Sequence, residues 1–161
     1  EMIAENSSLL KEESLCAKAL YYVSPLCGLK GATGGQFLDL KNDKNDFSAL
    51  KEIIYKKTTT LFEASFILGW LFGGGEESEI GTLSEIAYHL GMAFQIADDI
   101  QDIEQDRQNQ ALNSWLLLGK EKTLQLFKEH LHLFEEKLQR LNLFTKPFSF
   151  LLEALKNSIK Q

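Results

Sequence analysis

The near absence of proline restricts the fold of this sequence more than any other feature. The chain has 161 residues and two prolines, Pro25 and Pro147, so residues 26–146 contain no strong helix breaker. Apolar residues recur at helical spacing over much of this run, and no alternating strand pattern is long enough to indicate a sheet. We therefore expect an all-α chain, a bundle of about five or six helices within one domain.

Composition and charge exclude several classes of protein. Apolar residues make up 44% and charged residues 25%, which is typical of a globular domain. The net charge of −6 argues against binding to nucleic acid or to an anionic membrane. The longest uncharged runs, such as residues 64–75, are shorter than the roughly 20 residues of a membrane span. Two cysteines, Cys16 and Cys27, form no disulfide framework, so we expect a reducing, cytoplasmic environment.

The termini suggest that the chain is part of a longer protein. The acidic N-terminus lacks the basic-then-apolar pattern of a signal peptide. The first residue is Glu1 rather than Met, so we expect the natural start to lie upstream.

Apolar spacing and glycine positions predict where the helices lie. The expected helices cover residues 2–23 (ending before Pro25), 47–72 (stopped by Gly73–Gly75), 79–106, 121–141 and the segment after Pro147. The polar segment 107–114 is expected to be a loop. Four glycines between residues 28 and 35 allow either a loop or a helix packed very closely on a neighbour.

The most informative segment is the acidic one at residues 90–102. At about 100° per residue, Gln95, Asp98, Asp99 and Asp102 fall within an arc of roughly 100°, and apolar residues cover most of the rest. This pattern predicts a mostly buried helix with a narrow acidic stripe. A group of oxygen ligands with no His or Cys nearby suits Mg²⁺, which binds a few carboxylates together with water and the phosphate oxygens of a substrate. The pattern therefore indicates a site for Mg²⁺ and a diphosphate. The alternative is a solvated acidic patch at a helix end.

Two shorter segments could belong to the same site, one with a lysine and a hydroxyl and one rich in glycine. Lys57 and Thr58 could give a point charge and a hydroxyl to a phosphate, although a lysine pair on a helix is usually just solvent-facing. Gly34-Gly35-Gln36 alone is more often close packing than a ligand site. The histidines, at positions 89, 130 and 132, have no carboxylate or cysteine at ligand spacing, so we interpret them as structural or solvent-facing.

Together and in this order, these segments resemble the trans-isoprenyl diphosphate synthases, the farnesyl and geranylgeranyl diphosphate synthase family. Residues 94–102, Phe-Gln-Ile-Ala-Asp-Asp-Ile-Gln-Asp, look like that family's second aspartate-rich motif. Residues 31–40 resemble its glycine–glutamine helix, and Lys57-Thr58 its Lys-Thr pair. The resemblance implies the all-α isoprenoid synthase fold, of which residues 1–161 would be the C-terminal part.

The resemblance also implies an activity. Such an enzyme condenses an allylic diphosphate with isopentenyl diphosphate to a short-chain (C10–C20) isoprenyl diphosphate, and Mg²⁺ assists the departure of the allylic diphosphate. No nucleic acid takes part, and the complete protein would be a homodimer.

Roles carry over to the matching residues only. Asp98 would be the principal Mg²⁺ ligand, and Asp99 and Asp102 would hold metal-bound water or orient the ligands. Catalytic and substrate-binding roles would fall to Lys57, Thr58 and Gln95. Further substrate-binding residues would be Gln36 and Phe94, although core packing explains Phe94 equally well.

The resemblance covers only the C-terminal half of such an enzyme. The first aspartate-rich motif has no counterpart, because Asp98-Asp99 is the only Asp-Asp pair, so the chain alone is expected to be inactive. The segment after the second motif is also short, with Arg107 as its one basic residue. That departure favours an alternative function, a non-catalytic prenyltransferase-like subunit that modulates an active partner. A class I terpene cyclase and a plain helical interaction module account for fewer of the motifs.

Overall fold

The computed structural model describes residues 1–10, 13–41 and 46–160, and every regular element in these ranges is helical. In chain order the elements are α1 (Met2–Leu9), α2 (Glu13–Cys27), α3 (Ala32–Lys41), α4 (Phe47–Ile54), the π-helical turn η1 (Tyr55–Thr59), α5 (Thr60–Phe72), the 3₁₀ turn η2 (Glu77–Glu79), α6 (Ile80–Gln101), α7 (Ile103–Asn109), α8 (Ser114–Leu118), α9 (Lys120–Arg140) and α10 (Lys146–Ser158). The predicted all-α fold is confirmed. None of the described helices is long and apolar enough to cross a membrane.

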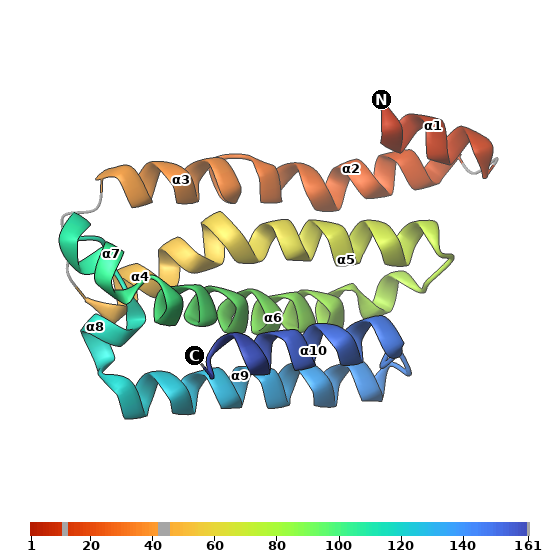
Figure 1. The fold of residues 1–161 in the computed structure, drawn as a ribbon. Coiled ribbons are helices and arrows are strands. Elements are labelled where there is room, and N and C mark those ends of the chain that lie inside the picture. Colours follow the sequence, from red (N-terminus) through yellow and green to blue (C-terminus); the bar gives the residue numbers. More distant parts are fainter. Residues whose placement is uncertain (11–12, 42–45, 161) are drawn as a thin grey trace.

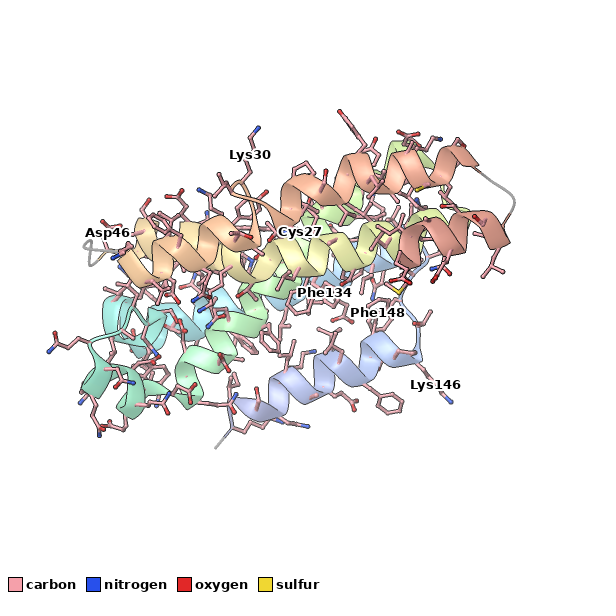
Figure 2. All side chains as sticks on the ribbon, turned by 90° about the horizontal axis from the view of Figure 1, so that it is seen from above. Cys27, Lys30, Asp46, Phe134, Lys146 and Phe148 are labelled. Atoms are coloured by element: carbon pink, nitrogen blue, oxygen red, sulfur yellow. The ribbon has the colours of Figure 1, made fainter. Side chains whose placement is uncertain are left out.

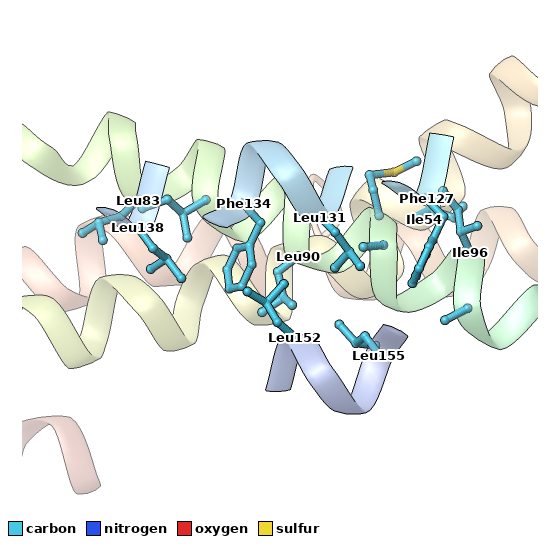
Figure 3. Close-up of a cluster of buried hydrophobic side chains, with 14 of the residues drawn as sticks. Ile54, Leu83, Leu90, Ile96, Phe127, Leu131, Phe134, Leu138, Leu152 and Leu155 are labelled. Carbon is cyan, nitrogen blue, oxygen red and sulfur yellow. The ribbon is translucent and has the colours of Figure 1, made fainter. Parts of the chain in front are cut away.

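The helices stack in layers around α6. Figure 1 shows α1, α2 and α3 along one side, α5 and α6 in the middle, and α9 with α10 on the opposite side. The main core lies between α6, α9 and α10, where Ile96, Phe134 and Leu138 are fully buried (Figure 3). Each such side chain contributes about 1.5–3 kcal/mol when it leaves water, so α6 is held mainly by apolar packing. The predicted mostly buried helix is confirmed.

A smaller core joins α2 to α5. Leu15, Ala19 and Val23 recur at four-residue steps on α2 and pack against Ile67 and Leu71 of α5. The first expected helix nevertheless differs from the prediction. It is divided into α1 and α2 around residues 11–12, which lie outside the described residues, and α2 continues through Pro25 to Cys27. Pro25 is exposed, so water can reach the helix carbonyl that lacks its usual backbone donor.

The helix expected at residues 47–72 is continuous but contains η1 in its middle. Asp46 caps its start, because the Asp46 carboxylate accepts a hydrogen bond from the amide of Ala49. The helix ends before Gly73–Gly75, as predicted. The helices predicted at residues 121–141 and after Pro147 correspond to α9 and α10.

Two predictions around residue 106 are wrong. The acidic helix α6 ends at Gln101 rather than near Asp106, and the chain bends at Asp102. The segment 107–114 is not a loop throughout, because α7 extends to Asn109 and α8 begins at Ser114. These short helices, with the division of the first helix, raise the number above the five or six expected.

Aromatic rings join α10 to the core. Phe148 of α10 stacks on Phe66 of α5 with ring centroids 5.8 Å apart. Phe148 also contacts Phe134 of α9 edge-on, with ring centroids 6.0 Å apart. Figure 2 shows the rings of Phe134 and Phe148 close together. Such pairs add about 0.5–1.5 kcal/mol beyond their burial.

A histidine pair links α6 and α9. The Nδ1 atoms of His89 and His130 lie 2.9 Å apart, so one nitrogen donates and the other accepts. Burial lowers the pKa of His130 to about 4, helped by His89 and by Lys51 of α4. Burial also lowers the pKa of His89, as does Lys137 of α9, while Glu85 and Glu129 oppose this. The pair is therefore neutral at pH 7, in line with a structural role.

This pair makes stability depend on pH. An unfolded histidine binds a proton near pH 6.5, whereas folded His130 does so only near pH 4. Between these values the unfolded state binds more protons, so stability is full above about pH 6.5 and falls as the pH drops towards 4. The free energy of unfolding of the wild type should fall when the pH is lowered from 7.5 to 5. In His130→Gln we expect this fall to be smaller by about 1–2 kcal/mol, measured by urea denaturation.

The exposed His132→Gln is the matched control and should lose as much as the wild type. Equal losses in all three proteins would contradict the prediction.

Candidate functional site

The candidate site is built on η1, which α3 and α6 approach very closely. A Cβ atom added to Gly35 of α3 would collide with the backbone nitrogen of Lys57. A Cβ atom added to Gly91 of α6 would lie 2.7 Å from Oγ1 of Thr59 and 2.9 Å from its Cα. Only glycine permits both contacts. Of the two alternatives for the glycine-rich segment, the structure shows a helix packed closely on a neighbour.

The π-helical turn carries the predicted Lys-Thr pair. Such turns insert one extra residue into a helix and are frequent at functional sites. The Oγ1 atom of Thr58 donates a hydrogen bond to Oε1 of Gln95 on α6 at 3.1 Å. The Nζ atom of Lys57 forms an ion pair with Oδ2 of Asp39 on α3 at 2.6 Å. The turn thus joins α3 to the acidic stripe of α6.

Gln95 connects the turn to the carboxylates. Its Nε2 atom donates long hydrogen bonds to Oδ2 of Asp98 (3.4 Å) and to Oδ1 of Asp99 (3.3 Å). A polar cavity of about 50 Å³ lies between this amide and the Lys57–Asp39 pair, with Thr58 and Asp99 also in its lining. It has room for ordered water. Lys57, Thr58, Gln95, Asp98 and Asp99 therefore form one connected cluster.

Asp98 and Asp99 are neighbours in sequence but lie in different environments. Asp98 is largely exposed, but the part of its side chain that is shielded from water raises the pKa of its carboxyl. Repulsion from Asp102 and Asp106 raises this pKa further. The hydrogen bond from Gln95 and the charge of Lys57 lower it. A cation bound at Asp98 would relieve this repulsion.

Asp99 is 4% exposed, and burial raises the pKa of its carboxyl too. Its Oδ2 atom accepts a hydrogen bond from the amide of Ser114 at 2.8 Å, which counteracts that shift. Asp99 therefore fastens α8 to α6 and leaves Asp98 as the more accessible carboxylate.

The described residues do not form a complete metal centre. No group of three or more His, Cys, Asp or Glu side chains among them converges as metal ligands. The donor set still fits Mg²⁺, which binds one or two protein carboxylates and keeps several waters. Asp98, with half-buried Asp102 beside it, can supply that share of a site.

An apolar groove begins at the Lys-Thr pair. Lys57, Thr58, Phe62 and Phe94 line a cavity of about 410 Å³, and the rings of Phe62 and Phe94 lie 5.6 Å apart. Through Ser65 it adjoins a second cavity of about 380 Å³ that follows α5. Phe94 is half-exposed towards this groove, so packing alone does not explain it. Gln36 lies exposed on α3 beside Gly35 and is not one of the described residues lining the groove.

Sequence reasoning missed Asn113, which is fully buried. Its Nδ2 atom donates to the carbonyl of Asp99 at 2.7 Å and to Oδ2 of Asp106 at 2.8 Å. Its Oδ1 atom caps α8 by accepting from the amides of Trp115 and Leu116. This network explains why the segment after the acidic helix is folded. An asparagine followed by a serine and a short apolar run is an N-cap signal and could have indicated it.

The chain matches known prenyltransferases in sequence. Residues 11–114 match the polyprenyl synthetase family. The chloroplastic geranylgeranyl pyrophosphate synthase 9 of Arabidopsis thaliana is 35% identical over 107 residues, which are 63% of this chain and 29% of the relative. A trans-prenyltransferase of African swine fever virus is 31% identical over 102 residues, 63% of this chain and 31% of the relative. The match thus spans less than a third of either relative.

Solved structures share the fold over nearly the whole chain. A farnesyl/geranylfarnesyl diphosphate synthase from Zymomonas mobilis has a TM-score of 0.77 at 22% identity, covering 97% of this chain and 55% of that one. A geranyltransferase from Helicobacter pylori, complexed with magnesium and isoprenyl diphosphate, has a TM-score of 0.72 at 25% identity, covering 98% and 56%. The chain corresponds to just over half of each.

The glycine contact at η1 generates the first prediction from this site. Gly35→Ala would force α3 away from backbone atoms of Lys57 that cannot move aside. We expect a loss of stability of about 1–3 kcal/mol in urea denaturation.

Gly81→Ala on α6 is the matched control. Nothing lies within 4 Å of the added Cβ, so it should be neutral or stabilising by up to about 1 kcal/mol. Equal effects of the two substitutions would refute the close approach of α3 to η1.

The Asn113 network generates the second prediction. Asn113→Asp keeps the acceptor that caps α8 but removes both side-chain donors and places a charge beside Asp106. We expect it to destabilise the protein by about 1–3 kcal/mol in urea denaturation. The exposed Asn109→Asp should change stability by less than about 0.5 kcal/mol. A wild-type midpoint for Asn113→Asp would mean that capping is its whole role.

Proposed function

Because this chain belongs to the polyprenyl synthetase family, we propose that it is the C-terminal half of an isoprenyl diphosphate synthase. The complete enzyme would condense an allylic diphosphate with isopentenyl diphosphate to a short-chain isoprenyl diphosphate. One observation carries the proposal: the polar cluster of Lys57, Thr58, Gln95 and Asp98 lies at the end of an apolar groove. This arrangement suits a substrate with an anionic head and a hydrocarbon tail.

Each residue of the cluster has a distinct task in this proposal. The Lys57 ammonium would bind a diphosphate oxygen, a contact for which Asp39 now provides the counter-charge. Thr58 and Gln95 would orient the head group through the hydrogen bond that they share. Phe94 and Phe62 would cover the reacting carbon and keep water away from it. Gln36 would reach the site only from the exposed face of α3.

The carboxylates would hold Mg²⁺. Asp98 and Asp102 supply oxygens, whereas Asp99, bound to Ser114, would act by positioning the helix end. When bound, the ion would neutralise charge on the departing diphosphate. The first aspartate-rich motif of the family would complete the site from the other half of the protein, so we expect these 161 residues alone to be inactive.

One observation favours the alternative of a non-catalytic subunit. The segment after α6 carries Arg107 as its one basic residue, and Arg107 lies near Glu104 at 3.9 Å. The Asn113 network that holds this segment supplies no further cation. A protein with this segment would bind Mg²⁺ and diphosphate more weakly and could modulate an active partner instead.

A homodimer is the proposed assembly. Tyr21 on α2 and Phe37 on α3 are 73% and 61% exposed, and Leu20 and Leu40 are exposed near them. A second copy covering this outer layer would bury an apolar surface that a monomer leaves in water. Cytoplasmic location stays a prediction that rests on the unpaired Cys16 and Cys27, of which Cys27 is exposed.

The test is a product assay with the complete protein, called the full chain below, which includes the half that would carry the first aspartate-rich motif. Isopentenyl diphosphate and an allylic diphosphate are incubated with and without Mg²⁺, and products are identified by mass spectrometry. We expect Mg²⁺-dependent isoprenyl diphosphates, and Asp98→Ala should reduce turnover by several orders of magnitude with the fold intact. Glu153→Ala, an exposed carboxylate of α10, should retain wild-type turnover.

The contrary results separate the two functions. Wild-type turnover in Asp98→Ala would reject the metal-binding role of Asp98. No product from a well-folded full chain would favour the modulating subunit.

A further inference from the structure

A cleft with an apolar floor lies between α9 and the end of α10, and none of its lining residues lines the candidate site. Its volume is about 580 Å³, within the usual range of small-molecule sites. The floor comes from Leu124, Phe127 and Leu131, which repeat at three- and four-residue steps on α9, and from Ile159 after α10. Phe127 and Leu131 also belong to the main core, so the floor is held by packing on both sides of α9.

Basic side chains border both sides of this cleft. Lys128 and His132 lie one helical turn apart on α9, and Lys156 lies in the last turn of α10. Lys160 follows the end of α10, where its Nζ atom donates to Oδ1 of Asn157 at 2.9 Å. Among the described residues that line the cleft, Glu135 is the one that is acidic. Lysines favour a helix C-terminus, which accounts for Lys156 but not for Lys128 in the middle of α9.

We propose that this cleft binds an anionic amphiphile, a molecule with one hydrocarbon tail and a phosphate or carboxylate head. The tail would lie over Leu124 and Ile159, where a cleft of this size takes a chain of moderate length. The head would lie between Lys128 and Lys156, whose ammonium groups donate to it from opposite sides. The local positive charge contrasts with the net charge of −6 of the whole chain, so the cleft attracts anions that the rest of the surface repels.

The occupant is a single dissolved molecule rather than a membrane. The apolar residues lie between two basic edges instead of forming the broad exposed face by which a helix enters a bilayer surface. Binding requires no metal, because the lysines themselves neutralise the head group. It is therefore separable from the proposed Mg²⁺ site at Asp98.

Calorimetry of the full chain with dodecyl phosphate tests the proposal, below the micelle concentration and with EDTA present. We expect saturable binding of one molecule per chain. Inorganic phosphate and dodecanol, which carry the head or the tail alone, should bind at least about tenfold more weakly. Equal affinity for dodecanol would reject the role of the lysines, and binding only to anionic vesicles would reject the cleft in favour of a membrane surface.

Substitutions in the cleft test whether the ligand binds there. The double variant Lys128→Gln with Lys156→Gln should weaken binding of dodecyl phosphate about tenfold. Ile159→Gln, half-buried at the chain end, should weaken it as well. The matched control is Lys30→Gln with Lys146→Gln, which changes net charge equally at two exposed sites, on the opposite side of the bundle and at the start of α10 (Figure 2).

The control should bind as the wild type does. If cleft and control variants lost affinity equally, the effect would be one of net charge and the proposal would be wrong. A photoreactive alkyl phosphate should label peptides from residues 124–135 and 156–160. Labelling confined to the α5 groove, between residues 57 and 70, would overturn the assignment.

Discussion

The candidate site depends on the close approach of three helical segments at η1. Gly35 and Gly91 let the backbones of α3 and α6 reach the turn from two sides, at distances that any side chain would prevent. The approach places Lys57 near Asp39 and Thr58 near Gln95, so a cation and a hydroxyl face the acidic helix. The extra residue of a π-helical turn directs these side chains without ending the helix. The close packing at the turn therefore also sets the geometry of the candidate site.

The candidate site also depends on the different environments of two carboxylates on α6. Asp98 and Asp99 are consecutive, so they point about 100° apart around the helix. One is exposed beside Lys57 and Gln95, while the other is buried against the amide of Ser114. A buried carboxylate is tolerated because it accepts hydrogen bonds, and it holds the end of α6 in place. The exposed carboxylate keeps free oxygens for a cation, which is what the proposed Mg²⁺ role of Asp98 requires.

Much of this fold could be predicted because it depends on local chemistry. The apolar repeat of Phe127, Leu131 and Phe134 predicts α9, and the glycines at 73–75 predict the end of α5. The segment after residue 101 could not be predicted in the same way. It is polar, and its folding depends on Asn113, which bonds to Asp99 and Asp106 from 14 and 7 residues away. Likewise, α2 continues through Pro25, which the local rule that proline ends a helix did not predict.

Local patterns in the sequence were enough to predict the helical class, the buried acidic helix and the order of the three motifs, because periodicity and glycine placement act over a few residues. The sequence also contained the resemblance from which the roles of Lys57 and Asp98 were expected. The tertiary structure alone decided the choice of a packed helix for the glycine-rich segment, the π-helical turn, and the different surroundings of Asp98 and Asp99. It also brought together the basic edges of the α9–α10 cleft. These features arise from contacts between segments far apart in the chain, and such contacts exist only once the bundle has packed.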